Sequence, residues 1–357
     1  MIQKTLREMV HKAWDERRRL VAPLMGFPGL QLTGGTIKLA QQNYGEHFKV
    51  LKALADTFAP DLIFPLMDLA VEANALGRLT VFPTQDSATV VHENFDMEEL
   101  SRLEQINIAF DTRLQGYVET VRLMSIGLPE TILRGAYVTG PYSLAALIMG
   151  ADQAATATVL NPDDLAMLCE FTTEKIEQYV RLLVGAGAQV ICVLEPTAVM
   201  LGPEQFDRFS AQFVQHICNS CRYTNVAVVY HTCGNSMHLI KSMVASGVDA
   251  LSLDSPESGV DLPEAARRAG DDIIIMGNIC PTGTLLKGTP RAVEAEVNQL
   301  LRDMAFSKNL VLSTGCDLPQ EVPLGNIAAF MNAGRRYRIP AKRGAPVSNS
   351  RQATDQC

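Results

Sequence analysis

The chain has 357 residues, of which 47% are hydrophobic and 20% charged, as in a globular protein with a substantial core. Its net charge of −8, with no basic stripe interleaved with aromatic residues, argues against nucleic-acid binding. No apolar run approaches the roughly 20 residues of a membrane helix, and the N-terminus lacks the apolar core of a signal peptide. We therefore expect a cytoplasmic protein with neither a nucleic-acid nor a membrane partner.

The chain shows no internal linker, so we expect one catalytic domain with two short extensions. Residues 1–20 have an amphipathic helical pattern and predict an N-terminal extension that caps or flanks the domain. The catalytic domain is expected over residues 21–342. Residues 343–357 are polar and predict a disordered tail.

Short apolar strands alternate with longer helical segments along the domain. The expected strands are Val21–Met25, Leu62–Leu66, Leu79–Phe82, Ala136–Thr139, Val190–Leu194, Val226–Tyr230, Ala250–Leu253, Ile273–Met276 and Leu310–Ser313. Helical patterns separate the later strands, over Asp207–Arg222, Met237–Ser246, Leu262–Ala269 and Ala292–Met304. This alternation predicts a parallel sheet, and its spacing of roughly 25 to 40 residues favours a (β/α)8 TIM barrel. No glycine-rich dinucleotide motif and no P-loop is present.

Two soft metal ligands stand at the end of one expected strand. His231 and Cys233 follow the apolar run Val226–Tyr230 and precede Gly234. Residues two apart on an extended chain point to the same side, so the imidazole and the thiol face one point. Cys316 ends a later strand in the same way. Three nitrogen and sulfur ligands with an open fourth position are typical of a catalytic zinc.

Other polar residues follow the remaining strands. Together with the three zinc ligands, the acid/base or ligand-type residues at strand ends are Asp68, Glu195, Asp254, Asn278 and Asp317. In TIM barrels the carboxyl ends of the strands form the active site, so these side chains are expected at one rim. Four of them also have an ordinary structural interpretation: Asp68 and Asp254 as caps, Glu195 as an acid at a helix start, and Asn278 as part of the backbone architecture.

Further cysteines need separate interpretations. Cys218 and Cys221 form a Cys-x-x-Cys pair within a helical pattern, and no second ligand pair follows at zinc-finger spacing. Cys280 could complete a Cys3His set with the other ligands, which would close the metal site and favour a structural zinc.

From about residue 20 to 340 the chain resembles the uroporphyrinogen decarboxylase superfamily, and within it the methylcobalamin:coenzyme M methyltransferases. The segments that carry the resemblance are Asp68–Gly77, Thr139–Leu144, Leu194–Pro196, His231–Asn235, Gly277–Ile279 and Ser313–Pro319. Its most specific element is His231-x-Cys233 followed distantly by Gly315-Cys316-Asp317. The resemblance implies that His231, Cys233 and Cys316 bind zinc.

The chain departs from the pattern of the decarboxylases themselves. Their arginine-containing segment corresponds to Met25–Gly29, which has no arginine, and their catalytic tyrosine corresponds to Leu147. Their C-terminal histidine corresponds to Cys316 here, and of these residues only the aspartate after the early strand is retained, as Asp68. A propionate-rich porphyrinogen would lack its cationic clamp, so decarboxylation of that substrate is disfavoured.

The resemblance implies a zinc-dependent methyltransferase that moves a methyl group from a methylated corrinoid to a thiol such as coenzyme M. No Asp-x-His-x-x-Gly corrinoid-binding signature is present, so we expect methylcobalamin to arrive on a partner corrinoid protein or free in solution. The alternatives are methyl transfer from a methoxy, methylamine or halomethane donor to the corrinoid, a decarboxylase relying on Asp68, and a non-catalytic zinc barrel.

Roles for individual residues follow from this chemistry as hypotheses. Glu195 is the candidate for a fourth zinc ligand or a catalytic group, and Asp68 could position the substrate or accept its proton. Asp254 and Asn278 could orient His231 or line the pocket. Tyr142 is expected as a wall of the cofactor pocket.

Overall fold

The computed structural model describes residues 5–340, which form an α/β barrel of eight parallel strands. The strands are β1 (Leu20–Val21), β2 (Leu62–Ile63), β5 (Leu133–Thr139), β6 (Val190–Leu194), β7 (Ala227–Thr232), β8 (Ala250–Leu253), β9 (Ile274–Ile279) and β10 (Leu310–Thr314). Their order is β1-β10-β9-β8-β7-β6-β5-β2. Asp61 joins the two end strands, because its amide donates to the Val21 carbonyl at 3.0 Å and its carboxylate accepts from the Val21 amide at 2.7 Å. The predicted TIM-type fold is confirmed.

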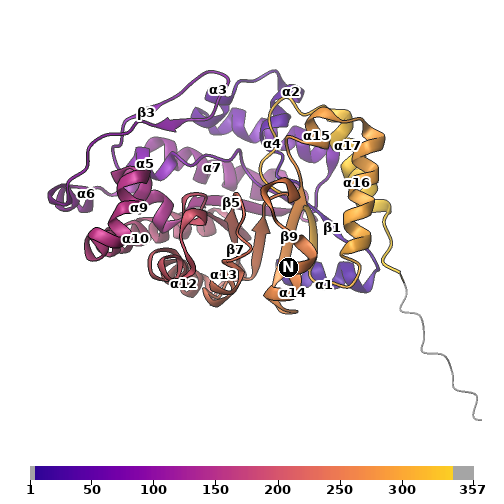
Figure 1. The fold of residues 1–357 in the computed structure, drawn as a ribbon. Helices are drawn as coiled ribbons and strands as arrows, with labels where there is room; N and C mark the ends of the chain where they lie inside the picture. The colour runs from indigo at the N-terminus through magenta and orange to yellow at the C-terminus, as the bar shows by residue number, and fades with distance from the viewer. Residues whose placement is uncertain (1–4, 341–357) are drawn as a thin grey trace, which may run out of the picture.

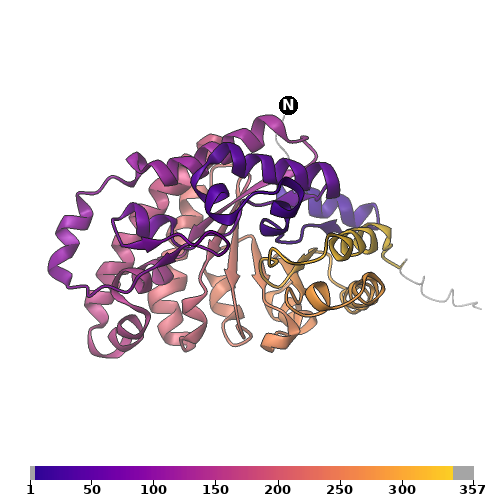
Figure 2. The same ribbon diagram turned by 90° about the horizontal axis from the view of Figure 1, so that it is seen from above.

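Helices connect and surround the strands. Their bounds are α2 (Leu30–Thr33), α3 (Ile37–Gln42), α4 (Tyr44–Phe58), α5 (Val71–Ala75), α6 (Leu100–Glu104), α7 (Thr112–Gly127), α8 (Pro141–Met149), α9 (Ala151–Leu160), α10 (Pro162–Ala186), α11 (Pro203–Phe206), α12 (Gln212–Cys221), α13 (Ile240–Ala245), α14 (Leu262–Ala269), α15 (Thr284–Lys287), α16 (Pro290–Asp303) and α17 (Leu324–Arg336). Figures 1 and 2 place the segment that carries α6 at the end of the molecule opposite α16 and α17.

The N-terminal helix α1 (Leu6–Asp15) precedes the barrel. Thr5 caps it with a complete capping box, in which the Thr5 hydroxyl accepts from the Glu8 amide and the Glu8 carboxylate accepts from the Thr5 amide. Its apolar face, formed by Leu6, Val10 and Ala13, packs into the same cluster as the side chains that fill the barrel. The helix therefore buries the apolar residues at the amino ends of the strands, as the amphipathic pattern predicts.

The segment 79–82 lies outside the barrel, whereas the sequence pattern placed a strand there in the series of parallel strands. It forms β3 (Thr80–Val81), which pairs antiparallel with β4 (Thr89–Val90). Leu79 and Val81 are exposed, so this hairpin carries apolar side chains without burying them in the core. The predicted tail over 343–357 lies outside the described residues.

No single helix among residues 5–340 is long and apolar enough to span a membrane, although α8 and α9, bent by 108° relative to each other, pass that test as a pair on length and composition. Nearly all of the α8 side chains are buried in the protein.

Candidate metal centre

His231, Cys233 and Cys316 converge at the carboxyl end of the barrel. The Cys233 sulfur lies 3.5 Å from His231 Nε2 and 3.5 Å from the Cys316 sulfur, and Cys316 lies 3.8 Å from Nε2. These residues form the one group of three or more potential metal ligands found within residues 5–340. The three ligands expected from the sequence are therefore brought together from β7 and from the end of β10.

The spacing of these atoms fits a tetrahedral zinc. Bonds of about 2.3 Å to sulfur and about 2.0 Å to nitrogen would place two sulfurs roughly 3.8 Å apart and a sulfur and a nitrogen roughly 3.5 Å apart. The three observed separations, 3.5, 3.5 and 3.8 Å, lie close to these values. One imidazole and two thiols are also the soft donors that zinc prefers.

A close backbone approach brings Cys316 to the other ligands. A Cβ atom on Gly315 would lie 2.5 Å from the Ser255 amide nitrogen and 2.9 Å from the Asp254 carbonyl carbon. Only glycine lets the end of β10 pass this near to the loop after β8. The Gly315 amide donates to the Ile279 carbonyl at 2.9 Å, which fixes the position.

Ser252 orients the His231 ring. Its hydroxyl lies 3.0 Å from His231 Nδ1, and both residues are buried. If Nε2 is to offer a lone pair to a metal, Nδ1 must carry the proton and donate it to Ser252 Oγ. In that tautomer the Ser252 hydroxyl, on the neighbouring strand, accepts the Nδ1–H hydrogen bond and holds the ring in place.

Asp254 and Asn278 support the loop that carries Cys233. Asp254 Oδ2 accepts from the Gly234 amide at 2.6 Å, and Oδ1 accepts from the Ser255 amide at 2.6 Å. Asn278 Nδ2 donates to the Asp254 carbonyl at 2.9 Å and to the Val260 carbonyl at 3.3 Å. These hydrogen bonds hold the backbone near the Cys233 and Cys316 thiols. They do not contact the His231 ring itself, which is held by Ser252.

The Cys316 thiol is protonated when no metal competes for it. A hydrogen bond with Cys233, followed by burial, raises the pKa of the Cys316 thiol well above its usual value, although His231 opposes this shift. A metal that binds here must displace a proton from this sulfur, so its affinity rises with pH.

Glu195 lies directly after β6, but its carboxylate faces helix α8. Oε1 accepts from the Tyr142 amide at 3.1 Å and the Ser210 hydroxyl at 2.8 Å, and Oε2 accepts from the Ser143 amide and hydroxyl at 2.9 and 2.7 Å. Burial raises the pKa of Glu195 to about 7, although these hydrogen bonds oppose the shift. The side chain does not belong to the ligand group, and its contacts favour anchoring of the α8 N-terminus.

Asp68 belongs to a buried ion pair on the same rim. Its Oδ2 atom accepts from the Tyr117 hydroxyl at 2.7 Å and from Arg113, and its Oδ1 atom accepts from the Ala70 amide at 2.9 Å. The side chains of Asp68 and Arg113 are both almost completely buried. Sequence reasoning missed Arg113, which lies 45 residues away at the start of α7 and carries no local motif.

Tyr142 is buried on the first turn of α8, and burial raises its pKa. The structure places its amide against Glu195. Asp317, the residue after Cys316, accepts from the Met67 amide at 3.4 Å and the Leu318 amide at 3.1 Å. Burial raises the pKa of Asp317 to about 7. Asp317 thus ties the end of β10 to the loop that bears Asp68.

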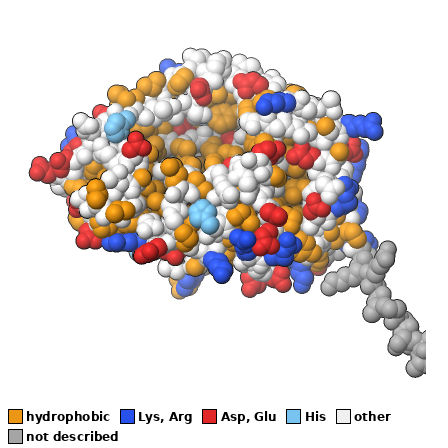
Figure 3. Space-filling model, viewed as in Figure 1, with side chains coloured by type: hydrophobic (Ala, Val, Ile, Leu, Met, Phe, Trp, Pro, Cys, Tyr) orange, Lys and Arg blue, Asp and Glu red, His pale blue; other side chains and the backbone are white. Residues whose placement is uncertain are grey.

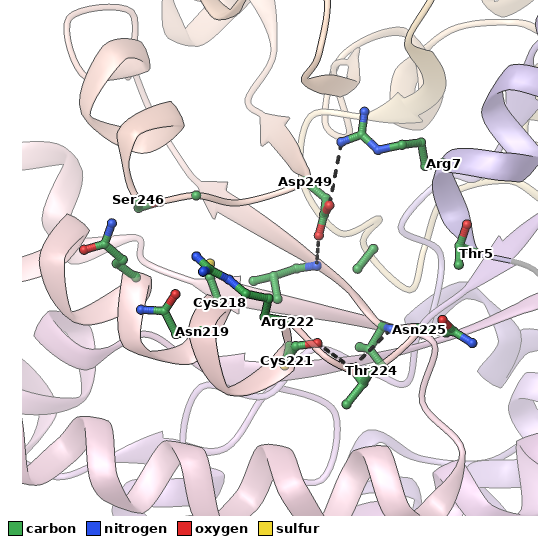
Figure 4. A pocket seen from close by; sticks show the side chains of 15 residues that line it. Thr5, Arg7, Cys218, Asn219, Cys221, Arg222, Thr224, Asn225, Ser246 and Asp249 are labelled. Carbon is green, nitrogen blue, oxygen red and sulfur yellow. Dashed lines mark hydrogen bonds and ion pairs between the residues drawn. The ribbon is translucent and has the colours of Figure 1, made fainter.

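The remaining cysteines of interest lie apart from the ligand group. Cys280 is buried with its sulfur 3.7 Å from the Thr282 hydroxyl, so it does not complete a Cys3His set. Cys218 and Cys221 line a pocket of about 350 Å³ with Arg7, Arg222 and Asp249 (Figure 4). This pocket is at the amino ends of β7 and β8, opposite the rim that bears the metal ligands.

Comparison with known proteins identifies the family. The uroporphyrinogen decarboxylase (URO-D) family model matches residues 31–337. The chain belongs to the uroporphyrinogen decarboxylase family. The family resemblance of the sequence motifs is thereby confirmed, and the protein is an enzyme of this family.

Relatives within the uroporphyrinogen decarboxylase family have different activities. The methylcobamide:CoM methyltransferase MtbA of Methanosarcina mazei is 27% identical over 258 residues, covering 71% of this chain and 73% of MtbA. A uroporphyrinogen decarboxylase of Synechococcus sp. is 28% identical over 288 residues, covering 78% and 79% of the two chains. A solved methyltransferase structure from Methanosarcina mazei has a TM-score of 0.80 at 21% identity, covering 92% of this chain and 98% of that one. The chain is about equally identical in sequence to a methyltransferase and to a decarboxylase. The choice between the two activities therefore depends on the residues of the site.

Proposed function

We propose that this enzyme transfers a methyl group from a methylated corrinoid to a small thiol, such as coenzyme M. The observation that carries the proposal is the convergence of His231 Nε2 with the sulfurs of Cys233 and Cys316 at separations of 3.5 to 3.8 Å. The likeness to MtbA, named for transfer between methylcobamide and CoM, supports the same assignment.

His231, Cys233 and Cys316 would hold zinc, with Glu195 and Cys280 both outside this group. Three protein ligands leave a coordination position for a substrate atom, as in catalytic rather than structural zinc sites. A zinc held by these residues would lower the pKa of a coordinating thiol and so supply a thiolate at neutral pH.

The reaction is a nucleophilic substitution at the methyl carbon. In this substitution the lone pair of the acceptor sulfur would form the new carbon–sulfur bond, and the electrons of the carbon–cobalt bond would stay with the corrinoid as cobalt(I). The thiol proton is released when the thiol binds. The products are a methyl thioether and a cobalt(I) corrinoid, so no further oxidant or reductant is required.

The chain's own residues orient these groups. The Ser252 hydroxyl is placed to accept a hydrogen bond from Nδ1 of His231 in the metal-binding tautomer, and Asp254 holds the Gly234 amide next to Cys233. Asp68 is the candidate for positioning the substrate, with its carboxylate fixed by Arg113 and Tyr117. The corrinoid, free or on a partner protein, would approach the rim of the barrel. Figure 3 shows a hollow in the upper half of the molecule, the side toward which β5, β7 and β9 point in Figure 1.

Decarboxylation of a porphyrinogen is less well supported. The thiol of Cys316 stands where the decarboxylases have a histidine, and Leu147 where they have a tyrosine. Arg113 supplies a buried cation near Asp68, but its observed partner is that aspartate, and no arginine lies in Met25–Gly29.

The test is optical. Zinc-loaded protein is mixed anaerobically with methylcobalamin and a series of small thiols, and the cobalt(I) absorption is followed. Thiol-dependent conversion that is lost in Cys316→Ser, and retained in Ser246→Ala on the far side of the barrel, supports the proposal. Absence of conversion with every thiol, despite one bound zinc per chain, contradicts transfer from free methylcobalamin and favours either a corrinoid carried on a partner protein or methyl transfer to the corrinoid from another donor.

A further inference from the structure

Tyr137 carries a buried hydroxyl that no other described residue uses. It lies on β5 with its side chain among those that fill the barrel interior, and it is 8% exposed. Its hydroxyl has no hydrogen-bond partner within residues 5–340. Buried polar groups are nearly always paired, because burial without a partner forfeits hydrogen bonds to water. The unpaired Tyr137 hydroxyl in the barrel interior is therefore available to a polar group that arrives with the substrate.

The ring of Tyr137 is held in a fixed orientation. It stacks on Phe64 with ring centroids 4.7 Å apart and an interplanar angle of 17°. Gly135 makes room for this stack, because a Cβ atom there would lie 2.3 Å from two Phe64 ring atoms. Gly135 and Tyr137 face the same side of β5. The missing side chain at Gly135 therefore leaves room for the Phe64 ring, and stacking on Phe64 fixes the plane of the Tyr137 ring.

Strand register places Tyr137 two residues below the level of His231 in the barrel: Tyr137 pairs with Cys192 on β6, and Leu194, two residues further on, pairs with His231 on β7. Burial raises the pKa of Tyr137 well above its usual value, and Asp317, Cys192, Cys316 and Cys233 each raise it further. Two of these four groups, Cys316 and Cys233, are the proposed zinc-binding thiols. At neutral pH the hydroxyl keeps its proton and is available as a donor.

A sulfur bound beside these thiols needs such a donor. Two thiolates and a neutral imidazole cancel the charge of a divalent zinc, so a third thiolate leaves the buried site with a net negative charge. A hydrogen bond to a charged acceptor stabilises that charge more than a bond between neutral groups.

We propose that the Tyr137 hydroxyl donates a hydrogen bond to the sulfur of the acceptor thiol when that sulfur binds beside Cys233 and Cys316. Tyr137 is then a catalytic residue that favours the deprotonated form of the acceptor. This inference rests on the proposed function, because it requires a thiol at the metal centre.

The experiment measures thiol binding directly, without turnover. The protein is loaded with cobalt(II) in place of zinc and titrated with 2-mercaptoethanesulfonate, and the sulfur-to-cobalt charge-transfer absorption gives the dissociation constant. Tyr137→Phe removes the hydroxyl and keeps the ring. Tyr337→Phe is the matched control, since the Tyr337 hydroxyl is also buried without a partner but lies after α17, near Arg19.

The expected result is that Tyr137→Phe binds one cobalt per chain as the wild type does, while its affinity for the thiol at pH 7 falls about 10-fold, as for loss of a hydrogen bond to a charged group. The pH at which half of the sites hold thiol should move upward, and Tyr337→Phe should match the wild type. Equal thiol affinity in Tyr137→Phe and the wild type overturns the role of Tyr137 and leaves the proposed function intact. Absence of a thiol-induced band in the wild type overturns the proposed function itself.

A second variant keeps the inference testable if Tyr137→Phe does not fold. Replacement of Tyr137 by 3-fluorotyrosine preserves the shape of the side chain and makes the hydroxyl a stronger donor. We expect thiol binding to tighten in this variant, the opposite sign to Tyr137→Phe. Unchanged binding would contradict the proposed hydrogen bond.

Discussion

The Ser252→Ala substitution removes the hydroxyl next to His231 Nδ1 and leaves His231 itself in place. In the wild type the Ser252 hydroxyl lies 3.0 Å from Nδ1, and both side chains are buried with about 1% of their surface exposed. Alanine leaves Nδ1–H without its acceptor, at a cost of about 1–3 kcal/mol for a buried polar group. Loss of the group that orients a metal-binding histidine commonly weakens metal binding about 10- to 100-fold, which corresponds to roughly 1.4–2.7 kcal/mol.

The assay is competition for zinc against a chromophoric chelator at fixed pH. Ser246→Ala is the matched control, because Ser246 is a buried serine whose hydroxyl donates to the Met243 carbonyl at 2.6 Å and serves only its own helix. We expect Ser252→Ala to bind zinc at least 10-fold more weakly than Ser246→Ala. If the two variants bind zinc equally well, the tautomer argument for His231 is refuted.

Three further predictions concern the metal ligands and the buried groups around them. Cys316→Ser should lose stoichiometric zinc by elemental analysis, because two ligands remain; one retained zinc per chain would contradict the ligand assignment. Glu195→Ala should keep one zinc but lose roughly 3–5 kcal/mol of unfolding free energy in urea, because its donors at α8 lose their acceptor; zinc loss without destabilisation would instead favour Glu195 as a ligand. His47 accepts from the Leu66 amide at 2.9 Å, and burial lowers its pKa to about 3. Since the folded pKa is below the unfolded value, this group's stabilisation is complete above the unfolded pKa and is lost as pH falls. Between pH 7 and 5 the wild type should lose about 2 kcal/mol more than His47→Gln, and equal losses would refute the neutral buried imidazole.

The sequence was sufficient for the barrel and for the convergence of His231, Cys233 and Cys316 at one rim. The two-residue spacing of His231 and Cys233 on a strand fixes their common direction, and the return of an apolar strand before Cys316 predicts its place on the same rim. These inferences depend only on strand periodicity and on the parallel order of the barrel. The separate β3–β4 hairpin was not predicted, because residues 79–82 have a strand pattern but nothing local shows which sheet they join.

The partners of the acidic residues could not be read from the sequence. Glu195 follows β6 as expected, yet its carboxylate binds the start of α8, whose approach to β6 is a tertiary feature. Arg113 meets Asp68 across 45 residues without any local signal. Tyr137 had a signal that went unused, since the alternation Leu133, Gly135, Tyr137 along β5 points an aromatic hydroxyl into the barrel.

X-ray absorption at the zinc edge, before and after addition of a thiol, tests most directly whether the metal centre binds the acceptor. We expect two sulfur neighbours and at least one nitrogen in the resting protein, from Cys233, Cys316 and His231, and a third sulfur neighbour once 2-mercaptoethanesulfonate is added. A zinc environment that already contains three sulfurs, or one that does not change with thiol, would contradict a catalytic metal centre with a position open to the acceptor.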